Sequence, residues 1–228
     1  MPNWPEDARA LRDLPEWVEV GLHLTLTLEV PLTSMTVARG GQLPGIDALR
    51  RLTHSRSVNL GEIAAEVRAQ FDQFTSVMGR APAFVDAHQH AHALPGIREV
   101  VLAETTRLAP AAWVRSCVDA PLAILARPYR GKALASALGS RGLAAAAGER
   151  GLTSNHGFAG HYGFAGDYAA VFSHFLRRPG RAHLVMCHPG EGARPGDAIA
   201  AARRHEAAAL SALPISDLAA QAGLAFPR

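Results

Sequence analysis

A cluster of chemically active side chains lies near the middle of the chain, in the stretch from Phe84 to His92. It reads Phe-Val-Asp-Ala-His-Gln-His-Ala-His, so that Asp86 precedes three alternating histidines, His88, His90 and His92. Imidazole and carboxylate groups bind zinc, and manganese, iron and nickel use them as well. On an extended segment every second side chain shares one face, so the imidazoles either converge on one metal ion or divide between metal and substrate. The alternative is a polar loop that happens to be rich in histidine.

Two further histidines, one within a predicted strand and one at the end of another, are candidates for the same site, since the active sites of α/β proteins gather at the carboxyl ends of parallel strands. Between residues 18 and 27, apolar and polar residues alternate, which predicts a strand with His23 on the face opposite the apolar set. His188 directly follows the apolar run Leu184–Cys187, as His88 follows its own strand. Taken alone, each histidine fits a hydrogen-bonded structural role. Three histidines in comparable positions favour a functional site.

The elements that must position these residues alternate between helix and strand patterns. Asn59 followed by Glu62 predicts a capping box for a helix that ends before Gly79. Further helices are expected over residues 95–108, 168–176 and 198–213, and further strands over residues 83–86, 113–117 and 184–187. This alternation predicts an α/β fold with a mostly parallel sheet or barrel.

Composition indicates one enzyme-sized domain over residues 1–228. Hydrophobic content of 48% with 19% charged residues is ordinary for a globular protein, and the net charge of +3 comes without a basic block, which argues against nucleic acid as a partner. Cys117 and Cys187 each lie in apolar stretches, which predicts buried thiols in a reducing compartment. No signal peptide and no membrane span is recognisable, so a soluble, cytoplasmic protein is expected.

Three segments carry a resemblance to a known family, and they occur in order over essentially the whole chain. They are Val20–Thr27, Phe84–Pro95 and Val185–Gly190, of which the Asp-x-His-x-His-x-His segment followed by Leu94 is the most specific. Arg115 and the loop from Asn155 to Phe158 fit the same pattern less specifically. The sequence resembles the YdjC-like (ChbG/HpnK) carbohydrate deacetylases.

The resemblance implies a distorted (β/α) barrel that carries one divalent metal ion, Mg or Zn. By the family pattern, His23 and His88 are metal ligands and His188 is the general acid or transition-state stabiliser. His90 and His92 are expected to line the substrate cleft. Asp86 either orients a neighbouring histidine or caps the turn after its strand. Arg115 either contacts the substrate or pairs with a nearby carboxylate.

The implied reaction is the removal of an acetyl group from an N-acetylated amino sugar by metal-activated water. The substrate would be a chitooligosaccharide or a glycosylated lipid precursor, and a homodimer is expected from the family. A metal hydrolase acting on another amide or on a phosphoester uses the same chemistry. The Gly- and aromatic-rich loop from His156 to Phe164 either closes over a sugar or fills the domain core with its rings.

One departure from the family pattern concerns the start of the chain. Family members open with an Asp-Asp-Phe-Gly type motif that supplies one metal ligand and the base, and residues 1–5 do not match it. The first βαβ unit is therefore expected to be missing, through a start assigned too late or a truncated natural or recombinant form. A site with two protein ligands should bind metal weakly. The alternative function is a catalytically impaired family member that binds sugar or acts as a scaffold.

Overall fold

The structure is a computed structural model that describes Trp4 and residues 8–191 and 196–226. The chain divides into two compact units. Unit 1 consists of Met1–Ser116 and Ser140–Ser154, and unit 2 consists of Cys117–Gly139 and Asn155–Arg228. The single domain expected over the whole chain stays a prediction.

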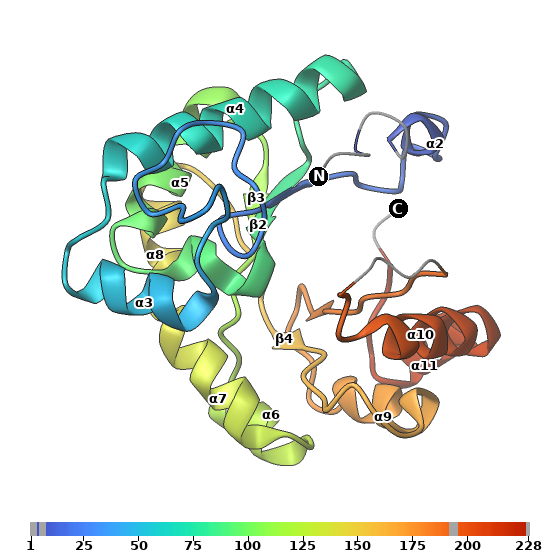
Figure 1. The fold of residues 1–228 in the computed structure, drawn as a ribbon. Helices are drawn as coiled ribbons and strands as arrows, with labels where there is room; N and C mark the ends of the chain where they lie inside the picture. Colours follow the sequence, from blue (N-terminus) through green and yellow to red (C-terminus); the bar gives the residue numbers. More distant parts are fainter. Residues whose placement is uncertain (1–3, 5–7, 192–195, 227–228) are drawn as a thin grey trace. The chain divides into compact units, whose positions relative to one another are not determined.

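Unit 1 is built on a parallel sheet of three strands in the order β1-β2-β3 (Figure 1). The strands are β1 (Leu22–Leu24), β2 (Phe84–Ala87) and β3 (Trp113–Val114). In this register His23 lies opposite Asp86 on the neighbouring strand. Because parallel strands end at one edge of a sheet, the residues that follow β1 and β2 emerge close together.

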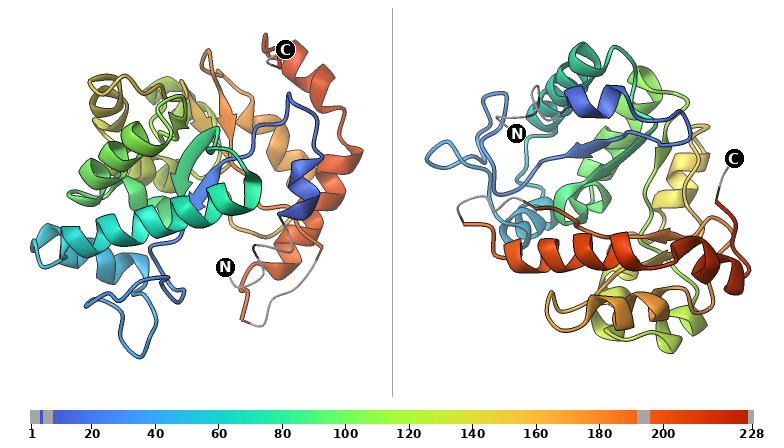
Figure 2. Two further views of the ribbon diagram at one scale, coloured as in Figure 1. Left: turned by 90° about the horizontal axis from the view of Figure 1, so that it is seen from above. Right: turned by 90° about the vertical axis from the view of Figure 1, so that its right-hand side faces the viewer.

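Unit 1 also contains helices before, between and after these strands in the chain. They are α2 (Arg9–Arg12), α3 (Ile46–His54), α4 (Leu60–Met78), α5 (Ile97–Leu108) and α8 (Leu143–Gly148). The predicted start and end of this helix are confirmed, since Asn59 Oδ1 accepts hydrogen bonds from the backbone N–H groups of Gly61 and Glu62, and the helix ends at Gly79 in the left-handed conformation. The reciprocal half of the predicted capping box is replaced, because Glu62 Oε1 accepts from the side-chain amide of Asn59 at 3.2 Å instead of from its backbone N–H. The helix buries its predicted apolar stripe and packs against β1 and α5 (Figures 1 and 2), with buried Ile63, Val67, Phe71, Phe74 and Met78.

The first strand is much shorter than the alternation between residues 18 and 27 predicts. Beyond Leu24 the backbone of Thr25 leaves the sheet and pairs with the side chain of Gln70 on α4. The Thr25 N–H donates to Gln70 Oε1 at 2.9 Å, and Gln70 Nε2 donates to the Thr25 carbonyl at 2.8 Å. A side-chain amide therefore takes the place of a neighbouring strand, because it satisfies the same backbone donor and acceptor.

Unit 2 holds a second, two-stranded parallel sheet of β4 (Phe158–Ala159) and β5 (Leu184–Val185). Its helices are α6 (Pro121–Ala126), α7 (Arg130–Gly139), α9 (Tyr168–Phe175), α10 (Ala200–Ala212) and α11 (Ile215–Gln221). The helices α9 and α10 lie side by side (Figures 1 and 2). The strands of both units are paired in parallel, and helices connect successive strands along the chain. The predicted α/β fold class is therefore confirmed.

Aromatic side chains form the core of unit 2. Tyr162, Tyr168, Phe172 and Phe175 are buried in one cluster with Ala159. Phe158 is buried as well, so the rings of Phe158 and Tyr162 serve the core, as one of the two interpretations of their loop predicts.

Cys117 is buried as predicted, whereas the prediction for Cys187 is wrong because β5 ends two residues before it and leaves it exposed.

The part of the chain that the structure describes holds no helix with both the length and the apolar character needed to cross a membrane.

Candidate functional site

The histidine segment turns sharply as soon as β2 ends. His88 to Ala93 form a short 3₁₀ helix that is broken inside by Gln89 and His90, whose φ angles are 53° and 60°. The expectation of an extended segment with all three imidazoles on one face is therefore wrong. Two consecutive residues in the left-handed region reverse the chain direction, so the two-residue period of a strand no longer applies. Such backbone costs about 1–3 kcal/mol per residue and is concentrated at functional sites.

His23 and His88 come together beside this turn. Their ring centroids lie 5.9 Å apart with an interplanar angle of 76°. The side chain of His23 is 52% exposed between the buried Leu22 and Leu24, as the strand pattern predicts. The structure thus brings together the two histidines to which the family resemblance assigns a metal.

Asp86 orients the ring of His23 from the neighbouring strand. His23 Nδ1 lies 2.6 Å from Asp86 Oδ1, and Asp86 also forms an ion pair with Arg115. Burial alone raises the pKa of Asp86, but the hydrogen bond with His23 and the charge of Arg115 hold it below the ordinary value. An ionised Asp86 accepts the Nδ1 proton of His23 and so leaves the Nε2 lone pair for a ligand.

Arg115 lies behind the histidines and not on the surface. It is 6% exposed, donates to the carbonyl of Ala87 at 2.8 Å, and lies 3.1 Å from Nδ1 of His90. Because a guanidinium only donates, that nitrogen of His90 is an acceptor. Of the two interpretations of Arg115, these contacts favour the pairing with a carboxylate over contact with substrate.

His92 is fully buried, and its Nε2 donates to the carbonyl of Arg115 at 2.7 Å. In this position the ring has no surface to offer a substrate, and its contact instead fixes the backbone of Arg115, directly after β3. The pKa of His92 is lowered to about 4, mainly by burial and then by the charge of Arg115. His92 is therefore neutral near pH 7.

We expect His92 to make unit 1 less stable in acid. Since its folded pKa of about 4 lies below the value of about 6.5 in the unfolded chain, the full stability is present above pH 6.5 and is lost as the pH falls toward 4. The loss is roughly 3 kcal/mol. It is measured as the difference between the pH dependence of the unfolding free energy in the wild type and in His92→Gln.

Matched replacement of an exposed histidine provides the control for this measurement. His54 on α3 is exposed, and His54→Gln should leave the acid-induced loss unchanged. Equal pH dependence in the wild type and in His92→Gln would contradict the prediction.

His188, in unit 2, follows β5 in a turn that a buried carboxylate on α10 holds. The backbone N–H of His188 donates to Glu206 Oε2, and Nδ1 of His188 lies 3.7 Å from Glu206 Oε1. The rings of His188 and Phe164 pack edge to face, with centroids 5.4 Å apart. The strand is shorter than predicted, since β5 ends at Val185, and His188 therefore lies three residues beyond its end instead of directly after it.

Sequence reasoning missed Glu206. It is completely buried, and Tyr162 donates its hydroxyl proton to Glu206 Oε1. The signal that points to it is its place on an apolar helix stripe, where a carboxylate must have partners. That stripe consists of Ala202, Glu206, Ala209, Leu210 and Leu213.

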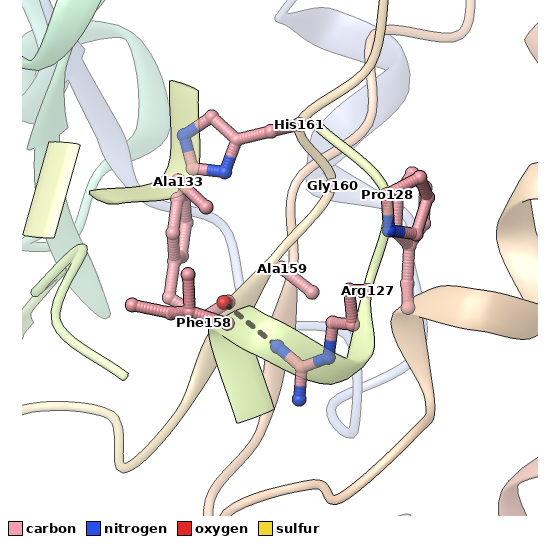
Figure 3. Close-up of a pocket in the computed structure, with 9 residues that line it drawn as sticks. Arg127, Pro128, Ala133, Phe158, Ala159, Gly160 and His161 are labelled. Carbon is pink, nitrogen blue, oxygen red and sulfur yellow. Dashed lines mark hydrogen bonds between the residues drawn. The ribbon is translucent and has the colours of Figure 1, made fainter. Parts of the chain in front are cut away.

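A small cavity in unit 2 is too narrow for a sugar ring. Figure 3 shows it beside the buried Arg127, which donates to the carbonyl of Phe158 at 3.2 Å. Its volume is about 10 Å³, which is room for one water molecule. The cavity is therefore not a substrate site.

The donors of unit 1 fit a divalent metal ion in part. Two imidazoles lie together, and a carboxylate fixes one of them, as is common behind metal-bound histidine. Over the described ranges, no cluster of three or more His, Cys, Asp or Glu side chains has the arrangement to hold a metal. His23 and His88 would thus supply two of the three or four protein ligands that such a centre usually has.

Comparison with known proteins shows the family to which the chain belongs. The family model described as "YdjC-like protein" matches residues 1–221. The chain belongs to the YdjC-like family, as the sequence resemblance predicts.

Individual relatives align with only part of the chain. A chitooligosaccharide deacetylase from Enterobacter sp. (strain 638) is 39% identical over 98 residues, which are 42% of this chain and 38% of that protein. A carbohydrate deacetylase from Danio rerio is 35% identical over 86 residues, which are 36% of this chain and 28% of that protein. These alignments therefore span well under half of either relative.

A solved structure shares the fold. It is that of a putative cellobiose-phosphate cleavage protein from Enterococcus faecalis V583, with a TM-score of 0.66 and 17% sequence identity. The similarity covers 98% of this chain and 80% of the other chain. At this identity the likeness supports the fold alone.

Proposed function

We propose that this protein is a metal-dependent carbohydrate deacetylase that removes acetyl groups from N-acetylated amino sugars. The observation that carries the proposal is the pair of His23 and His88, with Asp86 holding the first ring through its Nδ1. Membership of the YdjC-like family and the deacetylase names of relatives support the same reaction. A chitooligosaccharide is the substrate class that we propose.

In this proposal Nε2 of His23 and the imidazole of His88 hold a divalent ion, Mg or Zn, with further ligands outside these two side chains. Such an ion, when bound, lowers the pKa of water and polarises the acetamide carbonyl. The residues behind the pair keep it ready for binding. Asp86 fixes the tautomer of His23, and Arg115 fixes Asp86, so the imidazole of His23 does not have to reorganise.

The proton that the leaving amine requires is assigned to His188. An imidazole suits this role because its ordinary pKa lies near neutrality. Its ring stands between Phe164 and the carboxylate of Glu206, which restricts its rotation. His90, partly exposed on the turn after β2, is the remaining candidate for contact with the sugar. The homodimer, the glycolipid alternative and the cytoplasmic location stay predictions.

Acetate release tests the proposal directly. The whole chain is depleted of metal with a chelator, reloaded with Zn or Mg, and incubated with an N-acetylglucosamine oligomer. We expect acetate and a free amino sugar from the reloaded protein and a large loss of product after chelation. Binding of the oligomer without acetate release by any metal-loaded form would instead indicate a sugar-binding family member and would contradict the proposed reaction.

A further inference from the structure

The buried carboxylate of Glu206 in unit 2 has no role in the reaction proposed above. It lies in the middle of α10, and its side chain is 0% exposed. A buried carboxylate is costly unless hydrogen bonds compensate it, so its partners indicate its role. Those partners are His188 and Tyr162.

The contacts of Glu206 use both of its oxygens as acceptors. Oε2 accepts the backbone N–H of His188, and Oε1 accepts the hydroxyl proton of Tyr162 while facing Nδ1 of His188 at 3.7 Å. Burial alone raises the pKa of Glu206, but the hydrogen bonds from His188 and Tyr162 hold it below the ordinary value. The carboxylate is therefore ionised near pH 7.

The same helix fixes the turn that carries His188 at two other points. Arg203, one turn before Glu206, donates through its guanidinium to the carbonyl of His188 at 3.4 Å. The carbonyl of Arg203 accepts the N–H of Gly190 at 3.2 Å. Asp197 holds the guanidinium of Arg203 at 2.7 Å. The backbone on both sides of the imidazole is thus attached to α10.

Nδ1 of His188 is buried, and within the described ranges it has no hydrogen-bond partner. Glu206 Oε1 is the anionic acceptor that faces it, slightly beyond hydrogen-bond distance. A proton on Nδ1 is attracted to that carboxylate, whereas a bare Nδ1 lone pair would face a negative charge. The neutral ring therefore favours the Nδ1–H tautomer, with Nε2 directed to the reacting group.

We propose that Glu206 is a positioning residue that fixes the tautomer and the orientation of His188, so that Nε2 is the nitrogen that exchanges a proton with the substrate. The inference rests on the proposed role of His188 in the deacetylase reaction. Its physical basis is that of other carboxylate–histidine pairs, in which a buried acid selects one tautomer and stabilises the imidazolium.

Nitrogen NMR tests the tautomer without requiring any activity. Long-range proton–nitrogen correlations of the histidine rings, recorded on the whole chain at about pH 8, distinguish Nδ1–H from Nε2–H rings. His188→Ala identifies the signals of His188. We expect the Nδ1–H form in the wild type and a loss of that preference in Glu206→Gln, with partial recovery in Glu206→Asp.

Steady-state kinetics add a second readout. We expect Glu206→Gln to lower kcat at least about tenfold with little change in KM, because the substrate still binds while proton transfer is impaired. Tyr162→Phe, which leaves the carboxylate in place, should keep the Nδ1–H tautomer. Glu66→Gln is the matched control, since Glu66 is equally buried but lies in unit 1 and bonds the backbone of Leu32 and Thr33.

The outcomes separate this inference from the proposed function. An unchanged His188 tautomer in folded Glu206→Gln would overturn the inference, even if the wild type releases acetate. If the wild type releases no acetate but Glu206→Gln changes the tautomer, the positioning stands and the proposed reaction fails. Should Glu206→Gln not fold, Glu206→Met carries the test, because it removes the carboxylate and places an apolar side chain on the apolar stripe of α10. A His188 tautomer in that variant identical to the wild type overturns the inference.

Discussion

Replacement of His88 by alanine is expected to remove metal binding by the chain and to reduce acetate release by more than about 100-fold. His88 and His23 are the two imidazoles that lie together, so the loss of either leaves a single ligand. Even residues that only support a metal ligand typically change metal affinity or activity 10–100-fold, and a ligand itself should matter more. Metal content after equilibrium dialysis and acetate release from an N-acetylglucosamine oligomer measure the two effects.

His54→Ala provides the matched control for this prediction. His54 is an exposed histidine of unit 1 whose Nδ1 bonds the carbonyl of Arg50 within α3. Its replacement should leave both metal content and acetate release unchanged. The metal assignment fails if His88→Ala binds as much metal as His54→Ala does.

The second large effect is expected from Asp86→Ala, which should destabilise the folded state by about 3–5 kcal/mol. The reason is that Arg115 is buried and keeps its charge when its carboxylate partner is removed. The ring of His23 also loses the acceptor for its Nδ1 proton. Denaturant unfolding measures the change in free energy, and metal content is expected to fall in parallel.

The exposed ion pair between Asp47 and Arg50 gives the comparison. Its side chains are 76% and 52% exposed, so Asp47→Ala should cost no more than about 1 kcal/mol. Removing both charges, in Asp86→Ala combined with Arg115→Met, should recover part of the loss because no unpaired buried charge remains. Equal costs for Asp86→Ala and Asp47→Ala would contradict a buried, coupled pair.

Much of the fold could be predicted from local patterns. Asn59, Glu62 and Gly79 mark the ends of α4 because capping depends on residues three or four positions apart in the chain. The helices α5, α9 and α10 lie within about two residues of their expected bounds, since helical apolar spacing is also local. Strand lengths were harder to predict, as Thr25 shows, because the side chain that ends β1 comes from a distant helix.

The same distinction applies to the candidate site. Residue type and spacing are sufficient to select His23, His88 and His188 as candidates. The family resemblance pairs His23 with His88, and in the structure their rings lie close together. Spacing alone puts His88, His90 and His92 on one face, and this is wrong because the prediction assumes an extended chain where two residues adopt left-handed angles. No local pattern shows that Glu206 faces His188, eighteen residues earlier in the chain.

The sequence by itself thus determined the α/β class, the family and the chemical identity of the candidate residues, because those depend on side-chain type and on neighbours along the chain. The tertiary structure decided which of these side chains share a charge or a proton. It placed Asp86 between His23 and Arg115, buried His92, and set Glu206 against His188. Hydrogen bonds and burial shift protonation over a few ångströms of space, and such distances follow only from the packing of strands and helices far apart in the chain.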